Sequence, residues 1–168
     1  MDDAFYMRLA LAQAARAQAK NEVPVGAVVV SAEGELIGQG ANAVIGLSDP
    51  TAHAEVMALR EAASYLGNYR LPGASVFVTL EPCAMCLGAL FHARVSRIVY
   101  GASDLKTGAC GGRVDLSERG TLNHHAHIEG GVLTQECGQV LSQFFKARRG
   151  HYDSSPVCDL SFPARTSD

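Results

Sequence analysis

The sequence predicts a three-layer α/β/α protein with a central mixed sheet of about five strands, because strand-type and helix-type patterns alternate along the chain. A strand–helix–strand unit near the middle predicts a right-handed crossover between two parallel strands. Two short strand-type segments nearer the N-terminus are separated by only four residues, which predicts an antiparallel hairpin. Both pairing types are therefore expected in one sheet.

The first half of the chain supplies a helix, the hairpin and a second helix. Residues 2–20 are rich in alanine and carry apolar residues at helical spacing. The segments 23–30 and 35–42 flank Ser31-Ala32-Glu33-Gly34, which suits a hairpin loop. A second helix is expected over about 51–66, since proline precedes it and glycine follows it.

The second half begins with the crossover and ends with a helix. The remaining expected elements are a strand at 75–79, a helix from Pro82 to about Arg94, a strand at 97–100, an irregular loop at 101–123, a short strand at 126–129 and a helix at 132–149 that Gly150 ends. A glycine-rich and charged loop of this length is typical of a functional segment.

Length and composition predict one domain over residues 1–150, followed by a mobile tail at 151–168. The sequence contains no run of eighteen apolar residues, and its N-terminus is acidic, so we expect a cytoplasmic protein without a membrane partner. A net charge of −3 argues against nucleic-acid binding through a uniformly basic surface. A local basic patch remains compatible with it.

Three residues carry the donors of a zinc site. Cys83 and Cys86 are three residues apart, so on a helix they share one side, and a helix N-terminus there would favour thiolates. A Cys-x-x-Cys pair alone also fits a redox site, but His53 upstream favours metal. Three protein ligands leave one tetrahedral position for water, which is typical of a catalytic site with one zinc per chain.

Glu55 follows the histidine ligand by two residues, so it could be a catalytic carboxylate or a solvated helix charge. Positions i and i+2 point to nearly opposite sides of a helix, which counts against a shared site for His53 and Glu55. The difficulty is removed if both lie in the first turn of the helix. Cys110, Cys137 and Cys158 are scattered and are expected to be buried or incidental.

The motif His53-Ala54-Glu55 followed by Pro82-Cys83-Ala84-Met85-Cys86 resembles the signature of zinc nucleobase deaminases. Further segments, such as Glu22–Ala27, Asn68–Leu71 and Lys106–Ala109, extend this resemblance to the bacterial tRNA-specific adenosine deaminases over about residues 3–149. The resemblance implies a cytidine-deaminase-like fold, a homodimer, and hydrolytic deamination of adenosine to inosine at the anticodon wobble position of tRNA.

The same resemblance implies roles for individual residues. Glu55 would act as the proton shuttle for zinc-activated water, and Asn42 and the Ala54 backbone would contact the purine. Asp104 and Lys106 could contact sugar and phosphate, or simply be solvated in their loop. Asn123 and His124 lie in another matching segment and are included as substrate-binding candidates.

A basic and aromatic patch ends the last predicted helix and could bind the anticodon stem-loop. Phe144 or Phe145 could stack on a splayed base, while the other packs in the core. Arg148 and Arg149, with Lys146, could contact phosphates, although a basic helix end also balances the helix dipole.

Two other functions stay open at the level of sequence. The first is a deaminase of a free nucleobase or nucleoside, which would not need the Phe144–Arg149 patch. The second is a non-catalytic zinc-stabilised binding domain with Cys110 as a fourth ligand. Separately, residues 87–93 carry no charge, so this helix needs cover on more than one side, which favours a homodimer.

Overall fold

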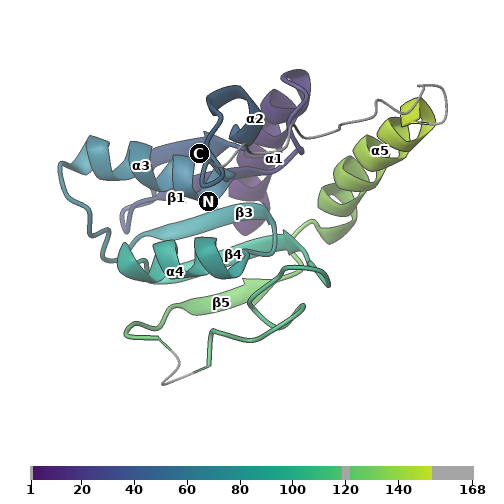
Figure 1. Cartoon of the computed structure of the whole chain (residues 1–168). Coiled ribbons are helices and arrows are strands. Elements are labelled where there is room, and N and C mark those ends of the chain that lie inside the picture. Colours follow the sequence, from purple (N-terminus) through teal and green to yellow (C-terminus); the bar gives the residue numbers. More distant parts are fainter. Residues whose placement is uncertain (1, 119–121, 153–168) are drawn as a thin grey trace, which may run out of the picture.

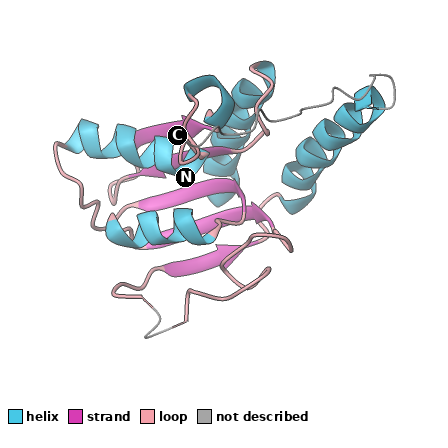
Figure 2. Cartoon of the chain, viewed as in Figure 1, coloured by secondary structure: helices cyan, strands magenta, loops and turns pink. Residues whose placement is uncertain are grey.

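The protein is described here by a computed structural model that covers residues 2–118 and 122–152. One five-stranded sheet, in the order β2-β1-β3-β4-β5, carries helices on both faces (Figures 1 and 2). This confirms the predicted three-layer class and the mixed sheet. The elements are α1 (Asp3–Ala19), β1 (Gly26–Val30), β2 (Leu36–Ala41), α2 (Val44–Leu47), α3 (Ala54–Leu66), β3 (Ser75–Leu80), α4 (Ala84–His92), β4 (Arg97–Ala102), β5 (His127–Gly130) and α5 (Thr134–Tyr152).

The strand pairing agrees with the predicted hairpin and crossover. β1 pairs antiparallel with both β2 and β3, whereas β4 pairs parallel with both β3 and β5. The chain crosses from β3 to β4 through α4, as a parallel pair requires. β3 and β4 therefore end at the same edge of the sheet.

Side chains of the central strands alternate between two apolar layers. Val28 and Phe77 pack in the layer that α1 covers, together with Met7. Val29 and Val78 pack in the opposite layer, with residues of α3 and α4. The helices of this second layer begin at the sheet edge where the functional residues gather (Figure 1).

Several element ends differ from the predictions. α3 begins at Ala54, about one turn later than expected, and the short helix α2 was not predicted. The prediction that Gly150 ends the last helix is wrong, because α5 continues to Tyr152. Glycine lowers helix stability by only about 1 kcal/mol relative to alanine, so it need not end a helix. Residues 153–168 of the expected tail lie outside the described residues.

Across the described residues, none of the helices combines the length and the apolar character that a bilayer crossing requires.

Candidate active site

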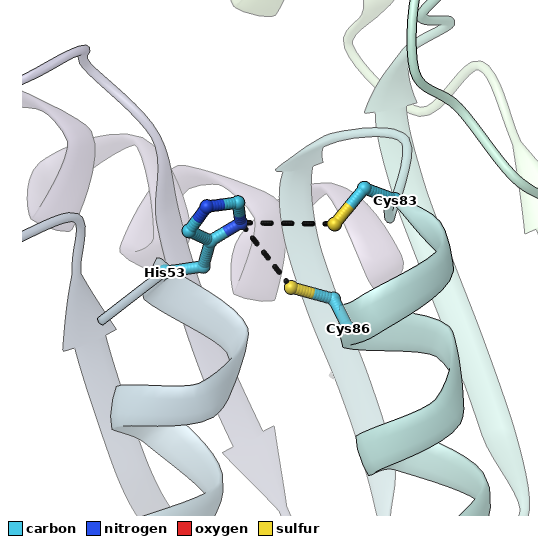
Figure 3. Close-up of side chains that lie close together, drawn as sticks. All are labelled: His53, Cys83 and Cys86. Carbon is cyan, nitrogen blue, oxygen red and sulfur yellow. Dashed lines mark hydrogen bonds between the residues drawn. The ribbon is translucent and has the colours of Figure 1, made fainter. Parts of the chain in front are cut away.

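The three predicted metal ligands meet where α3 and α4 begin. His53 is the N-cap residue of α3, Cys83 is the N-cap residue of α4, and Cys86 lies in the first turn of α4. Figure 3 shows the three side chains pointing toward one another. His53 Nδ1 lies 3.8 Å from Cys83 Sγ and 3.4 Å from Cys86 Sγ. Their potential ligand atoms all lie within 4.8 Å of one another.

The electrostatics of this cluster suit a divalent cation. Hydrogen bonds with Cys86 and His53 lower the pKa of the Cys83 thiol to about 4. The same contact with Cys83 raises the pKa of both Cys86 and His53. The three side chains contact one another through hydrogen bonds, and binding of a metal ion would replace these bonds and release the thiol protons. Two thiolates and one imidazole are donors that zinc accepts readily.

Glu55 lies beside the ligand cluster although it follows His53 by only two residues. His53 precedes the helix and has an extended backbone, with φ −71° and ψ 154°, so the two residues do not obey helical spacing. The side chain of Glu55 is only 4% exposed, and burial raises its pKa to about 7. A carboxyl group with a pKa near neutrality can both accept and donate a proton under physiological conditions.

A glycine on β2 fixes the depth at which α3 begins. A Cβ atom on Gly40 would overlap the carbonyl oxygen of Ala54 and the backbone nitrogen of Ala58. The absence of a side chain therefore lets the first turn of α3 lie directly on the sheet. This close packing places His53 and Glu55 at the sheet edge.

A cavity of about 180 Å³ opens at this edge, beside the ligand cluster. It brings together the predicted residues Asn42, Ala54, Glu55 and Asp104, which come from three separate parts of the chain: the end of β2, the start of α3 and the loop after β4. The cavity is lined by Val23, Val25, Asn42, His53, Ala54, Glu55, Leu80, Glu81, Cys83, Asp104 and Thr107.

Comparison with known proteins identifies the family of this site. Residues 1–102 match the cytidine and deoxycytidylate deaminase zinc-binding region. The chain belongs to the cytidine and deoxycytidylate deaminase family. This match contains the ligand cluster and Glu55, so the geometry and the family agree on a deaminase site.

Among individual relatives, tRNA adenosine deaminases share more sequence identity with this chain than a guanine deaminase does. The chain is 51% identical over 143 residues to the tRNA-specific adenosine deaminase of Haemophilus influenzae, covering 85% of this chain and 83% of that protein. A structure from a study of A-to-I editing by tRNA:A34 deaminases at the wobble position matches with a TM-score of 0.76 at 41% identity, covering 82% of this chain and 99% of that chain. A guanine deaminase structure from Bacillus subtilis matches with a TM-score of 0.60 at 29% identity, covering 89% of this chain and 95% of that chain.

The deaminase site has a second hollow nearby, formed by α5 and the loop after β4. This hollow measures about 420 Å³ and is lined by Lys106, Ser142, Phe145, Arg148 and Arg149. Phe144 is 7% exposed and Phe145 is 44% exposed, as expected if only one of the pair packs in the core. Arg148 lies 4.6 Å from the ring centre of Phe144 and donates a hydrogen bond to the carbonyl of Asn21 (2.8 Å).

Two predicted substrate-binding residues lie elsewhere. Asn123 and His124 line a different hollow, beside the C-terminal end of α4. Arg94 donates a hydrogen bond to the carbonyl of Asn123 (2.9 Å), and Nε2 of His124 lies 2.8 Å from the carbonyl oxygen of Val95. Within this chain, the structure therefore does not bring Asn123 and His124 to the deaminase pocket.

Sequence reasoning missed Glu81, which lies on the pocket wall and is only 2% exposed. It also missed Thr107, Val23, Val25 and Leu80 as pocket residues. The available signal for Glu81 was a charged residue placed between an apolar strand and a metal ligand. Among the described residues, Cys110 is not part of the ligand cluster, which counts against a closed four-ligand zinc site.

Proposed function

We propose that this protein converts adenosine to inosine in tRNA by hydrolytic deamination, at the wobble position of the anticodon. The observation that carries the proposal is the pocket, which joins the three-ligand cluster to the buried carboxyl group of Glu55 and to the amide of Asn42. Identity of 51% to a tRNA-specific adenosine deaminase favours this substrate over a free base.

His53, Cys83 and Cys86 would hold one zinc ion per chain. When bound, zinc would supply the Lewis acidity that makes water a nucleophile near neutral pH. Both thiols lie at the N-terminus of α4, and the pKa of Cys83 is lowered to about 4, so Cys83 can be a thiolate ligand before a metal binds.

Glu55 would carry the protons of the reaction. Water adds to C6 of adenine and the amino group leaves as ammonia. The carboxylate of Glu55 takes the proton of the attacking water, delivers it to N1 of the ring, and then helps to protonate the departing ammonia. The burial that raises the pKa of Glu55 to about 7 suits both directions of transfer.

Asn42 and Ala54 would orient the base in the pocket. An amide donates and accepts hydrogen bonds in one plane, which matches a purine edge. Ala54 lies in the first turn of α3 between His53 and Glu55, so its backbone is available at the reacting position. Asp104, on the pocket rim, and Lys106, two residues further along the loop, would contact the sugar and phosphate.

The hollow beside α5 would bind the anticodon stem-loop. A base must be splayed out of its stack to enter a small pocket, and aromatic rings stabilise the bases next to it. Phe145 is the exposed ring of the patch, and Lys106, Arg148 and Arg149 line the same hollow. These cations would contact backbone phosphates. A tRNA substrate also implies that the protein acts in the cytoplasm.

A side-by-side assay tests this function. Purified zinc-loaded protein is offered tRNA, free adenosine, guanine and cytidine, and inosine and ammonia are measured. Inosine should form in tRNA far faster than any free base or nucleoside is deaminated. Faster deamination of guanine or cytidine would instead make the protein a small-molecule deaminase, and no reaction with any substrate would favour a binding domain.

We also propose that two copies associate through α4. Its outward face consists of small or apolar residues that this chain leaves partly or fully exposed, followed by a histidine: Ala84, Met85, Gly88, Ala89 and His92. No atom lies within 4 Å of a Cβ atom built on Gly88, so a second helix could approach closely. Light scattering at micromolar concentration should give twice the chain mass. A monomer with undiminished activity on tRNA would contradict the homodimer.

A further inference from the structure

The loop that follows β4 is held in place by one buried side chain. β3 and β4 are parallel, with Leu80 opposite Ala102, so Glu81 and Asp104 both lie just beyond the same sheet edge. Glu81 Oε2 accepts a hydrogen bond from the backbone N–H of Asp104 (2.9 Å). Its Oε1 accepts from the N–H groups of Cys110 (2.9 Å) and Gly112 (2.8 Å).

The loop is built to approach this carboxylate. A Cβ atom on Gly108 or Gly112 would overlap the carboxylate of Glu81 and the carbonyl oxygen of Asp104. Three backbone N–H groups of the loop bind one carboxylate, and two glycines leave the space that this carboxylate occupies. We call these three hydrogen bonds the Glu81 anchor. Glu81 therefore accepts three hydrogen bonds from the loop after β4, whereas none of the described hydrogen bonds joins Glu55, on the same pocket wall, to that loop.

The loop carries the residues that would meet RNA beside the target base. Asp104 accepts hydrogen bonds from the N–H groups of Lys106 (2.8 Å) and Thr107 (3.2 Å) and from the Thr107 hydroxyl (2.6 Å). Asp104 and Thr107 line the catalytic pocket, and Lys106 lines the hollow beside α5. The Glu81 anchor thus fixes one short turn that borders both hollows.

We propose that Glu81 is a positioning residue for substrate binding: it aligns the Asp104–Thr107 turn so that the pocket rim and Lys106 engage RNA together. The proposal rests on the tRNA deaminase function proposed above. Glu81 acts through the backbone of the loop and takes no part in proton transfer. Its removal should therefore weaken RNA binding and leave the chemical step intact.

Glu81→Gln is the sharpest variant. An amide keeps one oxygen acceptor but presents an NH₂ group to at least one backbone N–H, so at least one loop contact is lost while side-chain volume is kept. We expect the KM for tRNA to rise about tenfold or more, the range expected for losing a hydrogen bond to a charged group. The kcat value should stay within about twofold, and zinc content should not change.

Two matched controls and a second variant accompany it. Glu61, an exposed residue of α3, also accepts a hydrogen bond from a backbone N–H group, that of Gln39 (3.3 Å). The first control, Glu61→Gln, should leave KM unchanged. Gly112→Ala disturbs the same anchor from the loop side and should reproduce the rise in KM. Gly138→Ala adds the same methyl group in α5 where no atom lies within 4 Å, and should have no effect on KM.

A double-mutant comparison distinguishes loop positioning from a general loss of stability. If Glu81 acts through the turn, then Glu81→Gln should raise KM less in a Lys106→Ala background than in the wild-type background. Equal effects in both backgrounds would contradict positioning of Lys106. A fall in kcat at constant KM would make Glu81 part of the chemistry, and loss of zinc would mean that it acts through Cys83; either result overturns the proposal.

Amide hydrogen exchange tests the anchor without any activity assay. In the wild-type protein, the amides of Asp104, Cys110 and Gly112 should exchange slowly, and in Glu81→Gln at least one should exchange about tenfold faster or more. Fast exchange of all three in the wild-type protein would overturn the proposal even if the variant failed to fold. If the wild-type protein has no activity on tRNA, the proposed function fails, while this exchange result still tests the anchor.

Discussion

The first turn of α3 and the end of β3 each bury a glutamate in the wall of the same pocket, yet the surroundings of the two carboxyl groups differ. The carboxyl group of Glu81 accepts hydrogen bonds from three backbone N–H groups. Glu55 is almost as buried, and desolvation raises its pKa to about 7. Desolvation therefore makes the charge of Glu55 easier to lose.

This difference assigns two roles within one site. A carboxylate that already accepts several hydrogen bonds is a poor proton carrier, because each transfer would break those bonds. A desolvated carboxyl group with few partners changes its protonation state at low cost. Burial alone therefore does not identify the catalytic acid or base; the backbone hydrogen bonds that tie Glu81 to the loop distinguish it from Glu55.

The largest effect should come from the predicted zinc ligands, each of which lies within a few residues of one of the two glutamates. Cys83→Ser or Cys86→Ser should lose zinc and deaminase activity together, because a serine hydroxyl is a poor zinc ligand. Metal analysis of the purified variants checks this. Cys137→Ala is the matched control, since Cys137 is buried in the opposite layer of the sheet. Full zinc and full turnover in either serine variant would contradict the ligand assignment.

A smaller loss of activity should follow from a substitution that displaces only α3, on one side of the pocket. Gly40→Ala introduces a methyl group against the backbone of α3, so we expect a loss of about 1–3 kcal/mol in the free energy of unfolding and a reduced kcat. Denaturant unfolding and steady-state kinetics measure the two effects. Gly138→Ala provides the control at an open position. Unchanged stability in Gly40→Ala would show that α3 does not depend on this close contact.

The smallest effect should come from the RNA-facing side, where Lys106 of the Glu81-anchored loop meets α5. Arg149→Ala should raise the KM for tRNA and reduce the slope of log KM against log salt by about one unit, because one phosphate contact releases about one counterion. The double variant with Arg148→Ala should reduce the slope further. Arg8→Ala, an exposed arginine on α1, is the control. An equal slope in all variants would remove the RNA-facing role of the patch.

The sequence predicted the parts of the fold and site that depend on local spacing. The crossover from β3 through α4 to β4 follows from apolar patterns over fewer than thirty residues. The ligands Cys83 and Cys86 follow from helical spacing, His53 completes a zinc-type donor set, and the motif resemblance supplies the role of Glu55. These features need no knowledge of distant contacts.

Features that depend on distant side chains were not predictable in this way. The short helix α2 is held by Glu22, whose Oε1 accepts a hydrogen bond from the N–H of Gly46 (2.7 Å), 24 residues along the chain. The three donors to Glu81 come from 23 to 31 residues away. Asn123 and His124 were assigned from a matching segment alone, and the fold places that segment beside α4 instead.

The measurement that tests the central claim most directly is zinc content together with turnover on tRNA for Glu55→Ala. If Glu55 is the proton shuttle and not a ligand, the variant should keep about one zinc per chain and bind tRNA normally. Its rate of inosine formation should fall by more than the roughly 10²–10⁴-fold typical of a single acid–base group, because Glu55 serves several steps. Loss of zinc, or a rate close to that of the wild-type protein, would contradict this account.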